Sequence, residues 1–430
     1  MLKRVLKFVP KFQINNVKHM MSETTSNDEV HMTTHELITK HGYIAETHHV
    51  WSEDGYRLEL HRVLCRAQEN GKNHNTQEFR DANCNLENDK LPLEVLNSKN
   101  RISKQPILIN HGLLSSSADW VLLGPRKALA YILCEEGYDV WLANVRGNSY
   151  SQCHKNLTVK DREFWNFSFH EIAIYDVPAM IDYVLEKTGH LNLYYIGYSQ
   201  GTTSFFAMLS EKPEYNAKVR SMISLAPIAF MSNQKSPLLK LLVRFYSVVE
   251  WGSFYCNIHQ WFPRHRFPAR ALGTFVRNSP DTLTRSFCNC WFHLIAGFGS
   301  NQLDKKMLPL IFGHFPAGAS AKQMIHFSQL ILSETFRKFD YGLSKNLLIY
   351  KSTQPPKYNL ERVKVPVYIF YSENDFLTHP VDVQRLAEKL PNVVKNHKIE
   401  YNKFNHIDYL WGKDSKVLLY NYILKALKDS

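Results

Sequence analysis

The sequence predicts an α/β protein whose main sheet is mostly parallel. Three observations lead to this fold class. Short apolar strands alternate with helical patterns from residue 106, the alternation stops between residues 231 and 345, and it returns before the end of the chain. Strands joined through helices run parallel, because such a crossover needs a dozen or more residues. Sheets of this kind are buried on both faces, so their strands are unbroken apolar runs.

Composition limits the kinds of protein that the chain can be. It has 430 residues, of which 44% are hydrophobic, and this is ample for a large core. The net charge of +12 suits an anionic interface such as a membrane surface or a lipid aggregate. The chain has no zinc-type spacing and no Gly-Lys-Ser/Thr phosphate loop, so we predict no nucleic acid partner, no metal and no cofactor. No apolar run reaches the roughly 18 uncharged residues of a spanning helix, so we expect a soluble or peripheral protein.

The first residues predict a basic leader, a helix and a hairpin. Residues 1–33 form the leader, whose first 21 residues carry five Lys or Arg and no acid. The leader lacks the continuous apolar stretch of a secretory signal, and it fits a transit peptide, a membrane-surface segment or a disordered leader. A short helix capped by a threonine is predicted over 34–43. Two alternating runs, 45–51 and 56–64, flank Asp54-Gly55, which is a hairpin signal.

A polar insertion separates this hairpin from the main sheet. Residues 66–105 are rich in Asn, Lys, Glu and Asp and poor in apolar residues, so we expect them to be exposed and disordered. The alternating elements of the sheet follow. Strands are predicted at 106–109, 138–143, 193–196 and 219–225, and helices at 124–136, 170–187 and 204–210.

A second layer then interrupts the sheet. Residues 231–345 are rich in apolar and aromatic residues without strand–helix alternation, so we predict a largely helical cap over the site. A packed layer with no lid role is the alternative. The sheet pattern returns at 346–430, which together with 34–230 forms the predicted core of the fold. Its last strands are predicted at 365–371 and 398–401, and its last helices at 380–390 and 417–427.

A glycine-flanked serine lies where one buried strand meets its helix. Gly197 to Gly201 form a G-x-S-x-G pentapeptide. In a nucleophile elbow of this kind the serine has a strained backbone conformation, so the residues beside it must lack bulk. The strain exposes the Oγ of Ser199 above the strand, and the N–H groups that begin the helix can stabilise an oxyanion. The alternative is an ordinary Gly-Ser turn.

Two later residues complete a catalytic constellation. Asp375 follows a strongly apolar strand and His406 follows the last predicted strand. Ligands of open α/β sheets bind at the carboxyl ends of strands, and the chain order serine, aspartate, histidine is that of α/β-hydrolases. A serine hydroxyl needs a base, and the base needs an acid that fixes its tautomer. We predict Ser199 as nucleophile, His406 as base and Asp375 as its partner, with Asp408 and Glu373 as rival carboxylates.

A series of short motifs extends this pattern from about residue 34 to the C-terminus, apart from the insertion. In order they are Glu53-Asp54-Gly55-Tyr56, His111-Gly112-Leu113-Leu114, Asp119-Trp120-Val121-Leu122, Gly137-Tyr138-Asp139-Val140-Trp141-Leu142, Arg146-Gly147-Asn148, Phe164-Trp165, Tyr175-Asp176-Val177-Pro178-Ala179, Gly201-Thr202-Thr203, Ala226-Pro227, Pro316-Ala317-Gly318, Asn374-Asp375 and Asn405-His406-Ile407-Asp408-Tyr409. The ordered set resembles the acid lipase family of α/β-hydrolases, which includes gastric and lysosomal acid lipases and many insect lipases. The resemblance implies an α/β-hydrolase fold with an N-terminal hairpin and a cap insertion.

The resemblance also implies roles for individual residues. It assigns the triad to the same serine, aspartate and histidine, and the oxyanion hole to the backbone N–H groups of Leu113 and Gln200. This agrees with the general rule that the residue after the nucleophile and the loop after the third strand supply these donors. His111 opens that loop, and we expect it to have a structural, hydrogen-bonded role.

Some positions depart from the family. The family usually has histidine where this chain has Tyr198, and we expect that side chain to point away from the substrate with little loss. The resemblance implies a disulfide in the cap, but Cys288 matches only one of its positions. The other position is Ser279, so Cys256 is an alternative partner. Cys134 lies in an apolar helical stretch and is predicted to be a small core residue. The odd total of seven cysteines predicts at least one that is free or paired between chains.

We therefore predict a serine ester hydrolase that cleaves long-chain acyl esters through an acyl-enzyme. The resemblance implies triacylglycerol or cholesteryl ester as substrate and a lipid–water interface as partner, with peripheral contact to a membrane or lipid droplet. The main alternative is a non-catalytic lipid-binding relative that keeps the fold. Acyl transfer or amide hydrolysis on the same scaffold is a third hypothesis.

Location is predicted from two signals that disagree. The resemblance implies a secreted or lysosomal protein, in which case the sequons at Asn156 and Asn166 are candidate glycosylation sites. We expect Asn166 to lie in a packed motif. The lack of a clear signal peptide makes an intracellular or organelle-targeted protein the alternative.

Overall fold

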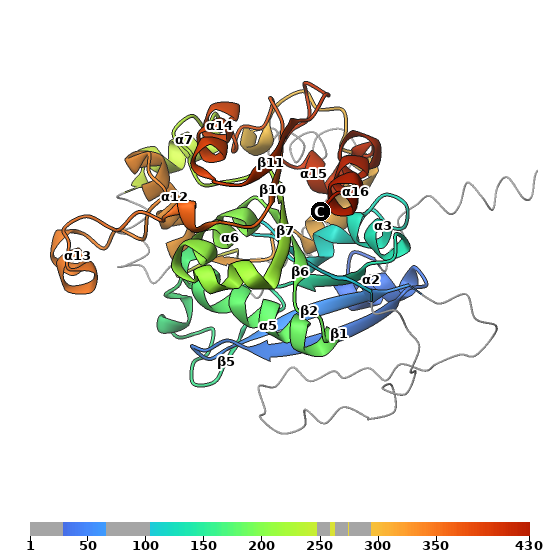
Figure 1. The fold of residues 1–430 in the computed structure, drawn as a ribbon, viewed down its shortest axis with the longest axis horizontal. Coiled ribbons are helices and arrows are strands. Elements are labelled where there is room, and N and C mark those ends of the chain that lie inside the picture. Colours follow the sequence, from blue (N-terminus) through green and yellow to red (C-terminus); the bar gives the residue numbers. More distant parts are fainter. Residues whose placement is uncertain (1–28, 66–103, 247–258, 263–273, 275–293) are drawn as a thin grey trace, which may run out of the picture.

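The computed structural model describes residues 29–65, 104–246, 259–262, 274 and 294–430 (Figure 1). The predicted leader, nearly all of the polar insertion and the cysteines of the predicted cap disulfide lie outside these residues. In the described part of the chain, no helix is long and apolar enough to cross a membrane.

The predicted mostly parallel sheet is confirmed. Its strands follow the order β1-β2-β4-β3-β6-β7-β10-β11, and β5 pairs with β2 at one side. The pairs of β2 with β1, β4 and β5 are antiparallel, and all pairs from β4 to β11 are parallel. The strands are β1 Ile44–Trp51, β2 Tyr56–Leu64, β3 Pro106–Asn110, β4 Asp139–Ala143, β5 Cys153–His154, β6 Leu193–Tyr198, β7 Val219–Leu225, β10 Val367–Tyr371 and β11 Val393–Lys398.

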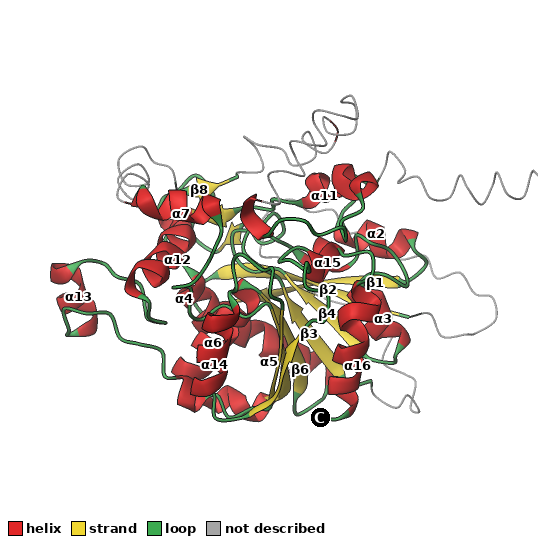
Figure 2. Cartoon of the chain, turned by 90° about the horizontal axis from the view of Figure 1, so that it is seen from above, coloured by secondary structure: helices red, strands yellow, loops and turns green. Residues whose placement is uncertain are grey.

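Helices cover both faces of this sheet (Figure 2). Alternate residues of β3 and β6 enter two separate cores: Ile109 and Ile196 pack on one face, whereas Leu108 and Tyr195 pack on the other. This follows from the two-residue period of a strand. The first core includes α3 (Leu129–Glu135) and α16 (Asn421–Lys428), and the second includes α5 (Val177–Thr188), α6 (Gln200–Glu211) and α14 (Pro380–Lys389).

Most predicted elements are confirmed with shifted ends. The hairpin forms around Asp54-Gly55, and α2 (Thr34–Lys40) begins with a capping box at Thr33. The helix predicted from 170 to 187 is continuous from α4 (Phe169–Glu171) through a π-helical turn, η5 (Ile172–Asp176), into α5.

Two predicted boundaries are wrong for local physical reasons. Helix α3 begins at Leu129 instead of residue 124, because Gly124 and Arg126 have left-handed backbone conformations with φ near 70°. The last strand is β11 and not 398–401. Strand β11 is an edge strand whose side chains alternate between exposed and half-buried, so its sequence lacks the apolar run of a central strand.

Mainly helical elements lie between β7 and β10 in the chain, as the sequence predicts. Figure 2 draws α7, α11 and α12 above the sheet. The described elements of this segment are α7 Pro237–Arg244, β8 Gln260–Trp261, η7 Lys305–Met307, α11 Leu308–His314, β9 Ala319–Ser320, α12 Ala321–Ser333, α13 Leu343–Tyr350 and η8 Leu360–Arg362.

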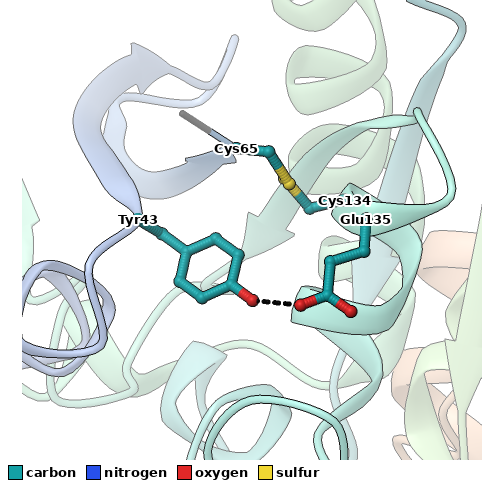
Figure 3. Close-up of a disulfide and its surroundings, with 4 residues drawn as sticks. All are labelled: Tyr43, Cys65, Cys134 and Glu135. Atoms are coloured by element: carbon teal, nitrogen blue, oxygen red, sulfur yellow. Dashed lines mark hydrogen bonds between the residues drawn. A yellow bond between two sulfur atoms is a disulfide. The ribbon is translucent and has the colours of Figure 1, made fainter. Parts of the chain in front are cut away.

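The prediction that Cys134 is only a small core residue is wrong. Cys134 is buried in α3, but it forms a disulfide with Cys65 over a Cα–Cα distance of 5.8 Å (Figure 3). Beside this bond, the Tyr43 hydroxyl donates to Oε1 of Glu135 at 2.5 Å. The two contacts fasten α3 to the hairpin where the polar insertion begins. Spacing along the chain does not indicate this pairing, because the two cysteines are 69 residues apart.

Candidate active site

Ser199 lies at a sharp turn between β6 and α6, as its motif predicts. Its φ of 51° and ψ of −117° are a strained conformation for a residue with a side chain. A Cβ atom on Gly201 would lie 2.5 Å from the Asn110 carbonyl oxygen, and one on Gly197 would lie 2.9 Å from the backbone of Gly201. Both glycines are therefore required by the close approach of helix and strands.

The three residues of the predicted triad meet at this turn. Nε2 of His406 lies 3.0 Å from Oγ of Ser199, and Nδ1 of His406 lies 2.7 Å from Oδ2 of Asp375. The serine and histidine are each 5% exposed and the aspartate is fully buried. They follow β6, β10 and β11, which are parallel strands, so their loops share one edge of the sheet.

The carboxylate of Asp375 is fixed by its own loop. Its Oδ1 accepts hydrogen bonds from the N–H groups of Leu377 at 2.8 Å and Thr378 at 2.9 Å, which leaves Oδ2 for the imidazole. A carboxylate on Nδ1 favours the tautomer with the proton on Nδ1, and Nε2 can then accept a proton from the serine.

The rival carboxylates contact other groups. Glu373 lies 3.5 Å from Nζ of the exposed Lys398. Oδ2 of Asp408 accepts from the Ser300 hydroxyl at 2.5 Å and from the Asn405 N–H at 2.8 Å. Asp408 is buried, and desolvation raises the pKa of its carboxyl to about 7. Its hydrogen bonds stabilise the turn that contains His406, so Asp408 has a structural position in this loop.

The loop at His111 packs against the elbow. A Cβ on Gly112 would lie 3.2 Å from Cβ of Ser199. Nδ1 of His111 lies 2.8 Å from the Gly112 carbonyl oxygen, and its Nε2 accepts from the Val145 N–H at 3.3 Å. Burial lowers the pKa of His111 to about 4, so the ring is neutral with its proton on Nδ1.

This histidine fixes the direction of the next peptide group. In a trans peptide the C=O and the following N–H point in opposite directions. Since His111 holds the Gly112 carbonyl, it also sets where the Leu113 N–H points. Within the part of the chain that the structure describes, neither Leu113 nor Gln200 donates its N–H to an acceptor. Gln200 opens α6, where the first N–H groups have no partner inside the helix.

Tyr198 makes a contact that the sequence did not indicate. It is buried, as a residue that points away from the substrate would be, but its hydroxyl donates to the His406 carbonyl oxygen at 2.8 Å. Its ring also packs on the loop that begins at His111, because a Cβ on Gly112 would lie 3.0 Å from Cε1 of the tyrosine. The one available signal was chemical: a buried tyrosine hydroxyl usually has a partner.

A second polar cluster joins three of the sequence motifs away from the serine. The guanidinium of Arg146 is buried and bonds to Asp176 at 2.6 Å and to Asp54 at 2.5 Å. Its charge also lies 4.0 Å from the ring centre of Tyr56. All three guanidinium nitrogens bond to these two carboxylates. The arginine therefore joins the hairpin, the loop after β4 and the π-helical turn η5.

The two sequons differ in their surroundings. Asn156 is exposed in a loop after β5. Asn166 lies in a packed motif, as expected, since its neighbours Trp165 and Phe167 are buried, but its own side chain is exposed. The Nζ of Lys322 donates to Oδ1 of Asn166 at 3.1 Å. Glycosylation of either asparagine stays a prediction.

Two family models match most of the chain. Residues 105–413 match the α/β hydrolase fold, and residues 34–124 match the partial α/β-hydrolase lipase region. Among solved structures, one described as a putative lipase from Sulfolobus solfataricus is similar over 90% of this chain and 94% of that chain, with a TM-score of 0.54. Its sequence identity is 15%, so this likeness supports the fold alone.

Three curated relatives cover nearly the full chain. Lipase 1 of Drosophila melanogaster is 37% identical over 92% of this chain and 80% of its own. Human gastric triacylglycerol lipase is 33% identical over 93% of this chain and 92% of its own. The lysosomal acid lipase/cholesteryl ester hydrolase of Macaca fascicularis is 33% identical over 94% of this chain and 93% of its own. The chain therefore belongs to the acid lipase family of α/β-hydrolases.

Proposed function

We propose that this lipase hydrolyses long-chain acyl esters through an acyl-enzyme on Ser199. The observation that carries the proposal is the continuous pair of contacts from Ser199 Oγ to His406 Nε2 at 3.0 Å and from His406 Nδ1 to Asp375 Oδ2 at 2.7 Å. A hydroxyl in this setting can lose its proton to the imidazole as it attacks a carbonyl carbon.

The reaction follows from the positions of these groups. Oγ of Ser199 attacks the ester carbonyl, and His406 takes the hydroxyl proton and passes it to the departing alcohol oxygen. Asp375 stabilises the imidazolium that forms in between. The N–H groups of Leu113 and Gln200 are the proposed oxyanion donors, and such donors typically contribute about 10²–10³ in kcat each. Water then repeats the attack on the acyl-enzyme, with the same histidine as base.

Triacylglycerol and cholesteryl ester are the proposed substrates. The printed names of the gastric and lysosomal relatives support them. An apolar surface next to the triad also supports them: Phe376 follows Asp375 directly, and its ring packs 5.6 Å from that of Phe298, which is 47% exposed. A long acyl chain needs an apolar surface of this kind beside the reacting carbonyl.

We propose that residues 231–345 are a cap joined to the catalytic loops, with the core at 34–230 and 346–430 and a leader at 1–33. The carbonyl of Ala296 accepts from the N–H groups of His406 and Phe376, both at 3.3 Å. Gly297 is equally close, since a Cβ there would lie 2.1 Å from the Asn374 carbonyl oxygen. These contacts support a cap whose position affects the histidine and aspartate loops directly.

The test compares Ser199→Ala with the wild type on a long-chain p-nitrophenyl ester. We expect kcat to fall by at least about 10⁴ while the melting temperature stays the same. Ser204→Ala, one turn along α6, is the matched control, since the Ser204 hydroxyl only bonds back to the Gln200 carbonyl at 3.0 Å. A fluorophosphonate probe should label the wild type and the control. Well-folded wild type that takes no label would favour the non-catalytic lipid-binding alternative.

We propose passage through the secretory route, with lysosomal or extracellular residence. The printed name of the lysosomal relative and the Cys65–Cys134 disulfide support this, because disulfides persist mainly in oxidising compartments. Sequencing the N-terminus of the mature protein, together with a glycosidase shift assay on Asn156→Gln and Asn166→Gln, tests it. An unshifted protein that keeps residues 1–33 would favour an intracellular location.

A further inference from the structure

Helix α13 presents an apolar surface to solvent. It projects from the body of the molecule beyond α12 in both views (Figures 1 and 2). Four of its eight residues are large, apolar and more than half exposed: Leu343 at 68%, Leu347 at 54%, Leu348 at 71% and Ile349 at 54%. Single exposed apolar side chains are ordinary on proteins, but a contiguous group on one short helix indicates an interaction site.

The one buried residue of this helix is polar. Asn346 is 1% exposed, and its Nδ2 donates to Oδ1 of Asp340 at 2.7 Å and to the Thr353 carbonyl at 3.1 Å. The Tyr350 hydroxyl donates to the Phe339 carbonyl at 2.9 Å. A surface helix normally turns its apolar side to the core, so α13 is reversed. Its anchoring contacts are hydrogen bonds, which hold the helix without covering its leucines.

The charged residues of α13 and of the segment that follows it are lysines, and the nearby Asp340 forms an ion pair with Arg337 at 3.0 Å. Residues 341–360 contain Lys345, Lys351 and Lys357 and no acidic residue. All three lysines are exposed, and none forms an ion pair with the residues that the structure describes. Apolar side chains fringed by lysine match an anionic lipid surface, where the apolar groups enter the acyl boundary and the ammonium groups meet phosphates. A protein partner with an apolar pocket alone would leave these lysines without a counter-charge.

Exposed apolar residues are also found on α7 and α12. Helix α7 packs against α12, and Leu241 and Phe245 on α7 are 53% and 49% exposed. Leu332 at the end of α12 is 57% exposed.

We propose that α13 is an anchor for anionic lipid surfaces, with Leu347, Leu348 and Ile349 inserted and Lys345 and Lys351 at the headgroups. The proposal deepens the proposed function, since it names the surface through which a lipase reaches insoluble esters. It does not depend on the triad, because adsorption needs no chemical step.

The first experiment measures binding without hydrolysis. Ser199→Ala protein is mixed with vesicles of phosphatidylcholine and phosphatidylglycerol and separated by flotation. Adding Leu347→Ser, Leu348→Ser and Ile349→Ser together should lower the partition coefficient at least about tenfold, because three apolar side chains lose their transfer from water. The matched control is Leu191→Ser, Val394→Ser and Val417→Ser, which changes three residues on other elements with exposures of 88%, 52% and 67%. The control should bind like the parent.

The second experiment separates charge from apolar insertion. Lys345→Gln with Lys351→Gln should weaken binding to the anionic vesicles about tenfold at low salt and leave the weak binding to pure phosphatidylcholine unchanged. Unchanged binding to anionic vesicles in both the serine and glutamine variants would overturn the proposal. So would a wild-type dimer that only the triple serine variant dissociates on sedimentation, since α13 would then be an interface between two copies of the chain.

The third experiment uses the active enzyme. With Ser199 intact, the triple serine variant should keep its rate on soluble p-nitrophenyl butyrate and lose about fivefold or more on emulsified triacylglycerol, where adsorption precedes catalysis. Equal melting temperatures show that the variant is folded. Failure of the proposed function is distinct: Ser199→Ala would then keep its rate on the soluble ester, whatever the vesicles bind.

Discussion

The two buried polar clusters described above are both assembled from residues far apart in the chain. The first is the triad of Ser199, His406 and Asp375, and the second is Arg146 with Asp54 and Asp176. In each cluster a carboxylate accepts a hydrogen bond from a basic side chain, His406 in the first and Arg146 in the second. Both clusters are largely buried. Burial and close contact therefore do not by themselves separate a reactive site from a structural one.

The clusters differ in what remains unpaired. In the arginine cluster both carboxylates and the guanidinium are bonded to one another, and Asp176 also accepts from the Arg146 N–H at 2.9 Å. In the triad the chain of contacts ends at a hydroxyl on a strained turn, beside N–H groups that have no acceptor among the described residues. A reactive site keeps donors and a nucleophile in reserve for a substrate, whereas a structural cluster satisfies every group internally.

The largest expected effect concerns the triad. In Asp375→Asn the amide keeps an oxygen for the Leu377 and Thr378 N–H groups and places its NH₂ toward His406. That NH₂ favours the wrong tautomer, so we expect kcat on a soluble ester to fall about 10⁴-fold with little change in stability. Steady-state kinetics and thermal unfolding measure the two effects. A loss of less than tenfold would mean that another carboxylate orients the imidazole.

In the arginine cluster we expect the opposite result, a loss of stability with little change in kcat. Arg146→Met leaves Asp176 buried without a counter-charge, so we expect the free energy of unfolding to fall by about 3–5 kcal/mol. The kcat of the folded fraction should stay near that of the wild type, because Arg146 does not contact the triad. Urea unfolding followed by active-site titration separates the two. Asp54→Asn is the milder control, since the Asp54 side chain is 27% exposed.

This contrast explains how much the sequence could predict. The elbow, the strand ends and the serine–aspartate–histidine order are patterns visible in the sequence, and they predict that Ser199, Asp375 and His406 lie together. The central strands were equally visible, since burial on both faces makes them apolar. The edge strand β11 was predicted at the wrong residues because every second side chain of it is exposed, so its sequence has no continuous apolar run.

Long-range contacts between ordinary residues left no such pattern. Nothing in the spacing of Cys65 and Cys134 indicates their bond, and Asp54, Arg146 and Asp176 were visible only as separate motifs. Their pairing depends on how the hairpin packs against the π-helical turn. That geometry is set by the whole core and not by a local segment.

The third prediction concerns Asp408, a structural carboxylate two residues from His406, the proposed catalytic base. Burial raises the pKa of its carboxyl to about 7, whereas the unfolded chain ionises near 3.9. Between about pH 4 and pH 7 the unfolded state has therefore lost this proton and the folded state has kept it, so the contribution of Asp408 to stability falls as pH rises and levels off above pH 7. We expect a loss on the order of 1–4 kcal/mol across this window.

Asp408→Asn should reduce that slope, because an amide resembles the protonated carboxyl and does not titrate. The measurement is the free energy of unfolding at pH 4.5 and pH 7.5 for the wild type and the variant. Part of the slope should persist, since burial also raises the pKa of Asp119 to about 7. Burial also lowers the pKa of His111 and His326, which adds a slope of the opposite sign that is the same in both proteins. The difference between the two slopes therefore tests Asp408, and equal slopes in the wild type and the variant would contradict the assigned direction.

The smallest expected effect concerns Tyr198, which shares features of both clusters. Its hydroxyl is hydrogen-bonded, as in a structural cluster, but its acceptor is the carbonyl oxygen of His406 at 2.8 Å. Tyr198→Phe removes the donor and leaves that buried carbonyl unpaired, which typically costs about 1–3 kcal/mol of stability. If the bond also positions the histidine, kcat should fall about tenfold with KM on a soluble ester unchanged.

A second tyrosine separates the two meanings of that loss. The buried Tyr420 donates its hydroxyl to the Tyr409 carbonyl at 2.9 Å, a bond of the same kind that does not involve the triad. Tyr420→Phe should therefore lose similar stability and keep its kcat. Tyr198→His, which restores the residue usual in the family, should recover part of the rate if an imidazole donor can reach the same loop. Equal kcat in both phenylalanine variants would make Tyr198 a packing residue alone, and the histidine loop would then depend on Asp408 and Ala296 for its position.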